Sequence, residues 1–450
     1  MKTQPKLTVS GYRGIWGESL NEEIASFYIE SFAIFLQKRN AKKILIGRDA
    51  RISGPEIVNV AKKILTESGI DVIDGGLLPT PTVLYLVRTM KFDGALMITA
   101  SHNPPQYNGI KFITDKALFT NEEEVAEISE NLGKKSVKKN HGTYTKEENL
   151  GTKHINHIVE NVNKDLIKEQ KYTVVLDAIN SVGSYLGPML LEKLGCTVYT
   201  LNGTPDGKFA HTPEPLAENL TDLAEKVKEY KADIGFALDP DGDRLVVCDE
   251  KGVVVFEEYT LSLAIKAILA KTPGDIVTNL STTNTNKDLV EETGFKNFRT
   301  KVGEANVVAG IVEHNAVIGG EGGGGVIYPQ INLCRDGFTG MALILESLAI
   351  SKHTVSHLVG ILPHYEFIKT KIPFSGNIKD IIEKMKTHFE EGVADTQDGL
   401  KVDMPDGSWI QIRASNTEPI IRIFAEAKTK EKAEQMIEDT KKIVEWSQIF

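Results

Sequence analysis

Three aspartates at alternate positions, Asp239, Asp241 and Asp243, follow the apolar segment 234–238. Carboxylates this close repel one another unless a cation lies among them, and hard oxygen ligands are those that Mg²⁺ and Ca²⁺ prefer. The spacing is similar to that of an EF-hand calcium loop, but Arg244 stands where that loop needs a glycine, and the flanking segments predict strands. The segment therefore predicts a magnesium site at the end of a strand, with a solvated acidic turn as the alternative.

A serine and a histidine follow another expected strand, at residues 95–98. Ser101 and His102 belong to the segment 99–111, in which Pro104 and Pro105 disfavour both helix and strand. Adjacent residues on an extended segment point opposite ways, so we do not expect this pair to share a proton directly, as a catalytic triad would. Ligands of open α/β sheets lie beyond the carboxyl ends of the strands, so we expect Ser101 and the aspartates at one site. The alternative is a turn that uses the serine and an asparagine as local caps.

A glycine-rich segment, 320–325, satisfies the G-x-G-x-x-G pattern of dinucleotide-binding proteins. The context excludes that interpretation, because Pro329 follows where the phosphate-binding helix should begin. The glycines are better suited to close approach of backbone to a ligand, with Glu321 as the side chain able to bind hydroxyl groups. A plain flexible loop is the alternative.

The segment 413–419, with Arg422 shortly after it, contains the donor groups that a phosphate dianion requires. It combines guanidinium, hydroxyl and amide groups on Arg413, Ser415, Asn416 and Thr417. A surface turn beside an unrelated arginine is the alternative.

Composition excludes several classes of protein. The chain of 450 residues has a formal net charge of −10 and no block rich in lysine and arginine, so we expect no nucleic-acid partner. The most apolar stretch, 341–350, contains Glu346 and is too short to span a bilayer, so we expect no membrane segment. Three widely spaced cysteines and an N-terminus without a signal-peptide pattern favour the cytoplasm. The sequence does not indicate an oligomeric state.

The order of the predicted elements favours several α/β units followed by a different module. Short β-branched runs alternate with amphipathic helices three times, which is typical of mainly parallel sheets with crossover helices. One helix is expected to begin after Asn21 and another is expected over 216–230, and further strands are expected at 43–46, 172–176 and 276–280. After Pro363 a strand, a helix, alternating strands and a terminal helix at 430–446 predict an α+β module. The polar segment 134–153 suits a linker or a long surface loop.

Together these segments resemble the α-D-phosphohexomutase family, which includes phosphoglucomutase, phosphomannomutase and phosphoglucosamine mutase. Residues 10–14, with Arg13, are similar to the family's N-terminal signature. Residues 99–104 are similar to its phosphoserine loop, 239–244 to its metal loop, 320–321 to the start of its sugar loop and 413–419 to its phosphate loop. The resemblance covers nearly the whole chain, in the family's order.

The resemblance implies a fold of three related α/β domains with mixed, mainly parallel sheets and a C-terminal α+β domain around a central cleft. The implied boundaries are 1–152 for a phosphoserine domain, 153–254 for a metal-binding domain, 255–365 for a sugar-binding domain and 366–450 for a phosphate-binding domain.

It also implies an activity, in which phosphorylated Ser101 exchanges its phosphoryl group with a hexose or hexosamine phosphate through a bisphosphate. The implied cofactors are Mg²⁺ and a hexose bisphosphate activator, and the implied metal ligands are Ser101 and the three aspartates. The implied catalytic residues are Ser101, His102, Lys111, Arg13, Arg244 and Glu304. The implied substrate-binding residues are Lys301, Glu321, Gly323, Arg413, Ser415, Asn416, Thr417 and Arg422.

Two positions depart from the family pattern. The sugar loop commonly ends in histidine, where this chain has Gly325, and a histidine often stands at the position of Glu304. We therefore consider Glu304 and Lys111 as the general acid and base, with a cap of the helix that opens at residue 305 as the alternative role of Glu304. An added carboxylate suits a 2-ammonium group, which favours glucosamine phosphate over glucose or mannose phosphate.

Two different classes of protein would also fit these loops, namely a sugar-phosphate binding protein without turnover and a metal-dependent phosphatase.

Overall fold

The computed structural model describes residues 7–374, 376–414 and 420–449, and it divides into two compact units. The first unit contains residues 1–267 and 323–360, and the second contains residues 268–322 and 361–450.

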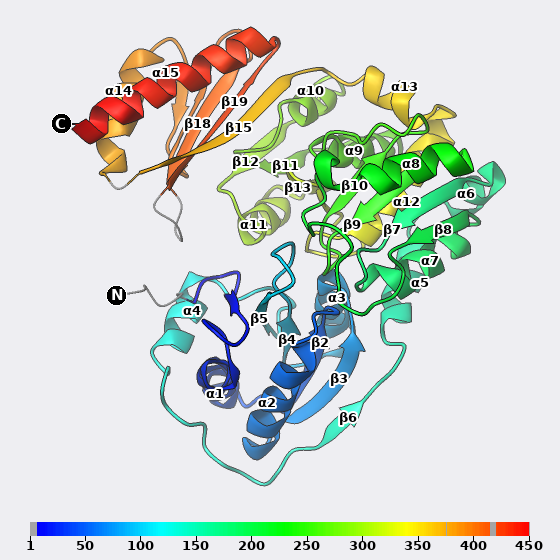
Figure 1. Cartoon of the computed structure of the whole chain (residues 1–450), viewed down its shortest axis with the longest axis vertical. Helices are drawn as coiled ribbons and strands as arrows, with labels where there is room; N and C mark the ends of the chain where they lie inside the picture. Colours follow the sequence, from blue (N-terminus) through cyan, green and yellow to red (C-terminus); the bar gives the residue numbers. More distant parts are fainter. Residues whose placement is uncertain (1–6, 375, 415–419, 450) are drawn as a thin grey trace. The chain divides into compact units, whose positions relative to one another are not determined.

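A six-stranded sheet begins the first unit (Figure 1). Its order is β1 (Tyr12–Ile15), β5 (Tyr107–Thr114), β4 (Gly94–Ile98), β2 (Lys43–Arg48), β3 (Asp71–Leu77) and β6 (Tyr144–Lys146). Strands β4, β2, β3 and β6 are parallel, whereas β5 is antiparallel to both β4 and β1. The helices of this part are α1 (Glu22–Lys38), α2 (Gly54–Glu67), α3 (Thr80–Met90) and α4 (Glu122–Ser129).

Helix α1 shows how the sequence specifies these elements. The side chain of Asn21 accepts a hydrogen bond from the backbone of Ile24 and so caps the helix, as expected. Ile29 and Phe32 on its apolar face are fully buried, and the Phe32 ring lies 4.7 Å from the ring of Phe112 on β5. The face that the 3.6-residue period predicts is therefore the face that packs on the sheet.

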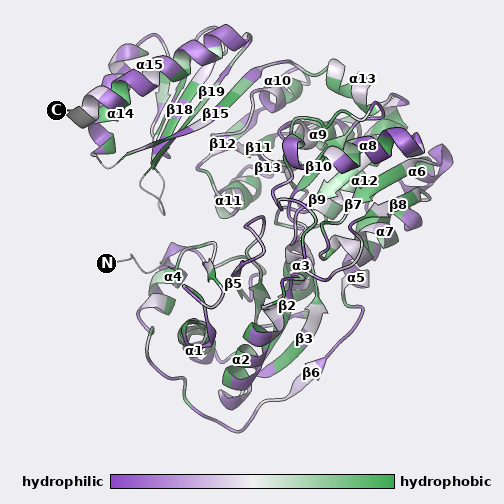
Figure 2. Ribbon diagram, in the orientation of Figure 1, coloured by the Kyte–Doolittle hydropathy of each residue, from purple (hydrophilic) through white to green (hydrophobic). Residues whose placement is uncertain are grey.

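A second sheet in the first unit has the order β10 (Leu245–Cys248), β9 (Ile234–Leu238), β7 (Thr173–Asp177) and β8 (Thr197–Leu201), with only β10 antiparallel to its neighbour. Around it are α5 (Gly151–Glu160), α6 (Lys164–Gln170), α7 (Gly183–Lys193), the 3₁₀ turn η1 (Ala217–Asn219), α8 (Thr221–Tyr230), α9 (Tyr259–Lys271), β14 (Gly325–Ile327), α12 (Gly337–Ser351) and α13 (Val355–Gly360); the end of α9 belongs to the second unit. Figure 2 shows hydrophobic residues concentrated in the strands and hydrophilic ones on surface helices such as α8.

The second unit contains two sheets. Strands β12 (Asn297–Thr300), β11 (Ile276–Asn279) and β13 (Ile318–Glu321) lie side by side and are parallel, with α10 (Thr285–Glu291) and α11 (Glu304–His314). The other sheet is antiparallel, in the order β15 (Glu366–Pro373), β19 (Ile420–Ala427), β18 (Trp409–Ala414), β17 (Leu400–Asp403) and β16 (Val393–Asp395). Helices α14 (Ile378–His388) and α15 (Lys430–Ile449) cover one face of it and share its hydrophobic core (Figure 1).

These observations confirm the predicted fold class of mixed, mainly parallel α/β sheets followed by an α+β module. Strands on both sides of the aspartates also confirm that the segment is no EF-hand, whose loop lies between helices. Two element predictions were wrong in extent. The segment 99–111 is not a loop throughout, because β5 begins at Tyr107 and pairs with β4. The helix expected over 216–230 is interrupted, and only Thr221–Tyr230 is α-helical.

Candidate active site

The three aspartates form a buried cluster in the turn between β9 and β10. All three side chains are fully buried, and one oxygen from each lies within 4.8 Å of the others. The Oδ1 atoms of Asp241 and Asp243 accept no hydrogen bond from any described residue. Buried carboxylate oxygens without a donor are costly, so the cluster suits a hard cation and not a solvated turn.

Two cations of the protein contact this aspartate cluster. Lys111 Nζ on β5 lies 2.7 Å from Asp241 Oδ2, and Arg335 Nη2 lies 2.7 Å from Asp243 Oδ2. Burial alone would raise the pKa of Asp241, but the charge of Lys111 and its hydrogen bond hold that pKa below its usual range. Burial and then the charges of Asp243 and Asp241 raise the pKa of Asp239 well above its usual value. Asp239 is therefore the carboxylate that most requires a further cation.

Ser101 lies directly against this cluster. Its Oγ donates to Asp239 Oδ2 at 3.0 Å, and its side chain is almost fully buried. Its backbone is in the left-handed region, with φ of +50°, and not extended. The predicted separation of Ser101 from His102 was wrong for this reason, because Ser101 Oγ lies 3.2 Å from His102 Nδ1. Burial and then the charges of Arg244 and Arg13 lower the pKa of His102 to about 2, which leaves the imidazole neutral.

The two arginines predicted from the sequence flank the loop that carries Ser101 (residues 99–107, the serine loop). Arg13 Nη1 on β1 donates to Asn103 Oδ1 at 3.1 Å. Arg244 Nη1, directly after the aspartates, lies 3.5 Å from Glu214 Oε1, and the same oxygen is 4.0 Å from His102 Nε2. A Cβ atom at Gly323 would lie 4.0 Å from Arg244 Nη1, so this glycine leaves the guanidinium accessible from that side.

Sequence reasoning missed a second layer of residues behind the serine. Arg51 and Asp49, just after β2, are fully buried and form an ion pair of 3.0 Å. Arg51 binds the backbone of the serine loop, and Thr99 joins Asp49 to Ser101. The available signal was an arginine five residues beyond a predicted strand and two residues from an aspartate, and the burial that gives this pair its role cannot be read from the sequence.

In the second unit, Glu321 lies at the end of β13 and is buried. Its Oε1 accepts from Asn279 Nδ2 at 2.9 Å and from the backbone N–H of Gly303 at 2.8 Å. Gly303 immediately precedes Glu304, which is the first residue of α11, and Lys301 is exposed just before them. Glu321 thus joins the predicted sugar loop to the segment that carries Lys301 and Glu304.

The arginines of the predicted phosphate loop lie side by side in the antiparallel sheet. Arg413 on β18 pairs with Arg422 on β19, and Arg422 pairs in turn with Lys371 on β15. Arg413 Nε is 2.9 Å from Asp398, whose Oδ2 also accepts from the backbone of Val302 at 3.1 Å. The single carboxylate of Asp398 does not balance the charges of Arg413, Arg422 and Lys371, so this part of the sheet favours binding of an anion. The predicted Ser415, Asn416 and Thr417 lie outside the described residues.

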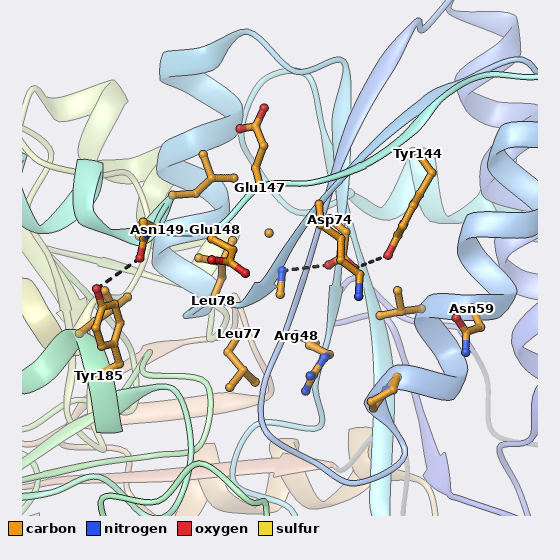
Figure 3. A pocket seen from close by; sticks show the side chains of 18 residues that line it. Arg48, Asn59, Asp74, Leu77, Leu78, Tyr144, Glu147, Glu148, Asn149 and Tyr185 are labelled. Carbon is orange, nitrogen blue, oxygen red and sulfur yellow. Dashed lines mark hydrogen bonds between the residues drawn. The ribbon is translucent and has the colours of Figure 1, made fainter.

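The structure thus places Arg13, Ser101, His102, Lys111, Arg244 and the aspartate cluster in the first unit. It places Lys301, Glu304, Glu321, Arg413 and Arg422 in the second unit. A separate cavity of about 450 Å³ opens at the carboxyl ends of β2 and β3, and Figure 3 shows Arg48, Asp74 and Tyr144 on its wall. None of the predicted site residues that the structure describes lines this cavity.

Comparison with known proteins decides the family. Four consecutive models, described as phosphoglucomutase/phosphomannomutase alpha/beta/alpha domains I, II and III and C-terminal domain, match residues 5–139, 152–252, 257–365 and 375–443. The chain belongs to this family. It is a phosphohexomutase, an isomerase of the intramolecular phosphotransferase class.

Relatives of this phosphohexomutase match along almost their whole length. A phosphoglucomutase/phosphomannomutase of Thermococcus kodakarensis is 38% identical, over 97% of each chain. A phosphoglucosamine/phosphogalactosamine mutase of Sulfurisphaera tokodaii is 34% identical, over 97% of this chain and 98% of its own. The crystal structure of a phosphoglucomutase/phosphomannomutase family protein from Burkholderia thailandensis aligns with a TM-score of 0.86 at 27% identity, over 100% of this chain and 98% of that one.

These findings confirm the resemblance and the fold class, and they place the aspartate cluster in a metal-dependent family. The orphan oxygens of Asp241 and Asp243 show that the residues of this phosphohexomutase fit a metal ion. Among the described residues, no helix is both long and apolar enough to cross a membrane.

Proposed function

We propose that this phosphohexomutase interconverts the 1-phosphate and 6-phosphate of glucosamine, with Ser101 as the residue that carries the phosphoryl group. The observation that carries the proposal is the hydroxyl of Ser101, buried and 3.0 Å from Asp239 Oδ2 in a cluster of three carboxylates. A buried serine oriented into acidic side chains is suited to an anionic phosphoryl group only when the carboxylates also bind a cation.

Asp239, Asp241, Asp243 and Ser101 would hold that cation, which we propose to be Mg²⁺. When bound, it neutralises charge on the phosphoryl group and orients it for transfer, which is most of what such a reaction needs from a protein. Lys111 is held by Asp241 at 2.7 Å, so its ammonium adds a fixed positive charge beside the same group.

The proposed reaction consists of two half-reactions. In the first, a sugar hydroxyl oxygen bonds to phosphorus as the bond from Ser101 Oγ to phosphorus breaks; Glu304 accepts the hydroxyl proton, and the ammonium of Lys111 gives a proton to Ser101 Oγ. The hexose bisphosphate turns over, and in the second half Ser101 Oγ takes the other phosphoryl group and returns its proton to Lys111, while Glu304 gives its proton to the leaving sugar oxygen. Free bisphosphate enters the same cycle and serves as activator.

We propose that residues of the second unit bind the phosphate that is not reacting and the sugar. Arg413 and Arg422, with the segment 415–417, bind the phosphate that is not reacting, and Glu321 with Lys301 binds the sugar. Such remote binding energy orients either end of the sugar at Ser101. We assign these roles to domains at 1–152, 153–254, 255–365 and 366–450.

Glucosamine phosphate is the preferred substrate in this proposal. Its ammonium group would be balanced by Glu304, and a relative of similar length acts, by its name, on glucosamine and galactosamine phosphates. Glucose and mannose phosphates are the second candidates, since the 38% identical relative is named phosphoglucomutase/phosphomannomutase.

The test is a coupled assay that compares glucosamine, glucose and mannose phosphates with their bisphosphates supplied. We expect the largest kcat/KM for glucosamine phosphate, phosphate on Ser101 in the purified protein by peptide mapping, and no turnover by Ser101→Ala. A phosphate mapped elsewhere, or turnover by the alanine variant, would contradict the proposal. Binding without turnover would make the protein a sugar-phosphate binder, and net release of phosphate would make it a phosphatase.

A further inference from the structure

The guanidinium group of Arg51 has all five of its N–H bonds engaged. Nε donates to the carboxylate of Asp49, and the other four donate to backbone carbonyls of the loop that carries Ser101. The acceptors and distances are Ser101 O at 2.6 Å, Asn103 O at 2.6 Å, Pro104 O at 2.6 Å and Tyr107 O at 3.0 Å. One buried side chain therefore fixes four carbonyls within seven residues of chain.

Asp49 completes this arrangement from the other side. One of its oxygens accepts from the backbone of Arg51 at 2.9 Å, and the other accepts from Thr99 Oγ1 at 2.6 Å. The same Thr99 hydroxyl oxygen accepts from the backbone N–H of Ser101 at 2.9 Å. The serine is thus held at its N–H through Thr99 and at its carbonyl through Arg51.

The backbone of Ser101 needs such support. Its φ of +50° places the backbone of Ser101 in the left-handed region. This conformation is unfavourable for a residue with a Cβ atom and persists only where the surrounding structure imposes it. This conformation directs Oγ to within 3.0 Å of Asp239 Oδ2. In an extended backbone, the side chain of Ser101 would point differently.

We propose that Arg51 is a positioning residue for phosphoryl transfer, acting with Asp49 and Thr99. It contacts no reacting atom, and it acts by fixing the loop so that Ser101 Oγ stays in line with the transferring group. The inference rests on the proposed role of Ser101 and extends it to Arg51 and Asp49, which the family motifs above do not include. Buried ion pairs are weak contributors to stability, which agrees with a role in geometry.

Arg51→Lys is the direct test, because lysine has three N–H donors where arginine uses five. At least two of the five hydrogen bonds are lost while the charge beside Asp49 remains. A misplacement of about 1 Å at the reacting atom can lower a rate about 10²-fold, so we expect kcat to fall about 10- to 100-fold. The KM for the sugar phosphate should stay within about twofold of wild type, since the hydrogen bonds of Arg51 go to Asp49 and to the backbone of the loop that carries Ser101, and none goes to Glu321 or Arg413.

Arg48→Lys is the matched control. Arg48 is also close to Asp49, since its Nη1 donates to the carbonyl of Asp49 at 3.0 Å, but it lines the separate cavity and contacts no carbonyl of the serine loop. Figure 3 shows its side chain at that cavity. The same substitution there should leave kcat unchanged.

The decisive measurement is the incorporation of phosphate into Ser101 from labelled bisphosphate, followed in time well below the melting temperature. A positioning role predicts full final stoichiometry reached more slowly in Arg51→Lys. Normal rate with reduced stoichiometry would mean a misfolded fraction, and normal rate with full stoichiometry would mean no role; either result overturns the inference.

A second pair of variants keeps the test decisive if Arg51→Lys does not fold. Thr99→Val removes the hydroxyl that links Asp49 to Ser101 with little change in shape, and Thr99→Ser restores it. We expect the valine variant to incorporate phosphate more slowly and the serine variant to recover. Equal rates in both would contradict the inference. Absence of phosphoserine in the wild type would instead overturn the proposed function itself.

Discussion

Replacing Asp239 by asparagine should stabilise the protein without magnesium and lose most of that advantage when magnesium is bound. In each pair within the cluster, ligand atoms lie within 4.8 Å of one another. At that distance and an effective dielectric constant of about 20, two unit charges repel by about 3 kcal/mol. Lys111 and Arg335 offset part of this repulsion, and they bind Asp241 and Asp243, not Asp239. We therefore expect Asp239→Asn to stabilise the metal-free protein by about 1 to 2 kcal/mol, or about 2 to 8 °C in Tm.

This gain should depend on pH in a defined direction. Burial and the neighbouring carboxylates raise the pKa of Asp239 in the folded protein above its unfolded value. The protonated group contributes stability that is fully present below the unfolded pKa and is lost as pH rises through the folded pKa. In chelator, the wild type should therefore lose Tm as pH rises, whereas Asp239→Asn loses less. The gap in Tm between the two proteins should widen as pH rises above about 4, the unfolded pKa of aspartate.

Magnesium should remove most of this gain in stability. A ligand at 100 times its Kd stabilises a protein by about 2.7 kcal/mol, and a tenfold weaker site at the same concentration gains only about half as much. Asp239→Asn should thus show a smaller rise in Tm on addition of Mg²⁺ and a much lower kcat. Thermal unfolding at four pH values, each in chelator and in Mg²⁺, makes the comparison. An equal Mg²⁺ shift in both proteins, with a Tm gap that does not change with pH, would refute the assignment of the cluster to a cation.

The choice of Asp239 over Asp241 follows from the structure. Asp241→Asn should also weaken Mg²⁺ binding, but it would leave the buried ammonium of Lys111 without its carboxylate. Removing one partner of a buried pair typically costs about 3 to 5 kcal/mol, which would mask the metal effect. Asp241→Asn therefore serves as the control in the same cluster for a loss of stability that does not come from the metal.

Three further outcomes are expected. Arg413→Ala should raise KM and lower kcat/KM about 10- to 100-fold, because a charge-assisted contact contributes about 1.5 to 3 kcal/mol; an unchanged kcat/KM would move the phosphate site elsewhere. Glu304→Gln should lower kcat about 10²- to 10⁴-fold with little change in Tm, and normal turnover would make Lys111 the next residue to test for proton transfer. Burial lowers the pKa of His211, but the hydrogen bond to Asp177 at 3.0 Å, the charge of Asp177 and the hydrogen bond to the backbone of Thr212 together raise it above its usual value. The stability that this imidazolium adds is therefore present below about pH 6.5 and lost as pH rises through the raised value. The Tm deficit of His211→Gln should accordingly shrink from pH 6 to pH 9, and a constant deficit would show that the charge is not involved.

The sequence by itself determined the elements and the chemistry of the loops. Asn21 and the apolar period after it specify α1, and three aspartates after an apolar strand specify a cation site, because capping and charge repulsion are local properties. Parallel strands end at the same edge of a sheet, so the meeting of Ser101 with the aspartates could also be expected.

Only the tertiary structure decided how the serine is held and which charges balance the aspartates. The left-handed conformation of Ser101 is unfavourable locally and depends on carbonyl contacts to Arg51, about 50 residues away in the chain. Arg335 reaches Asp243 from the start of α12, and no local pattern predicts this pair. Buried hydrogen bonds and ion pairs between distant segments follow from packing, which a linear pattern of residue types does not contain.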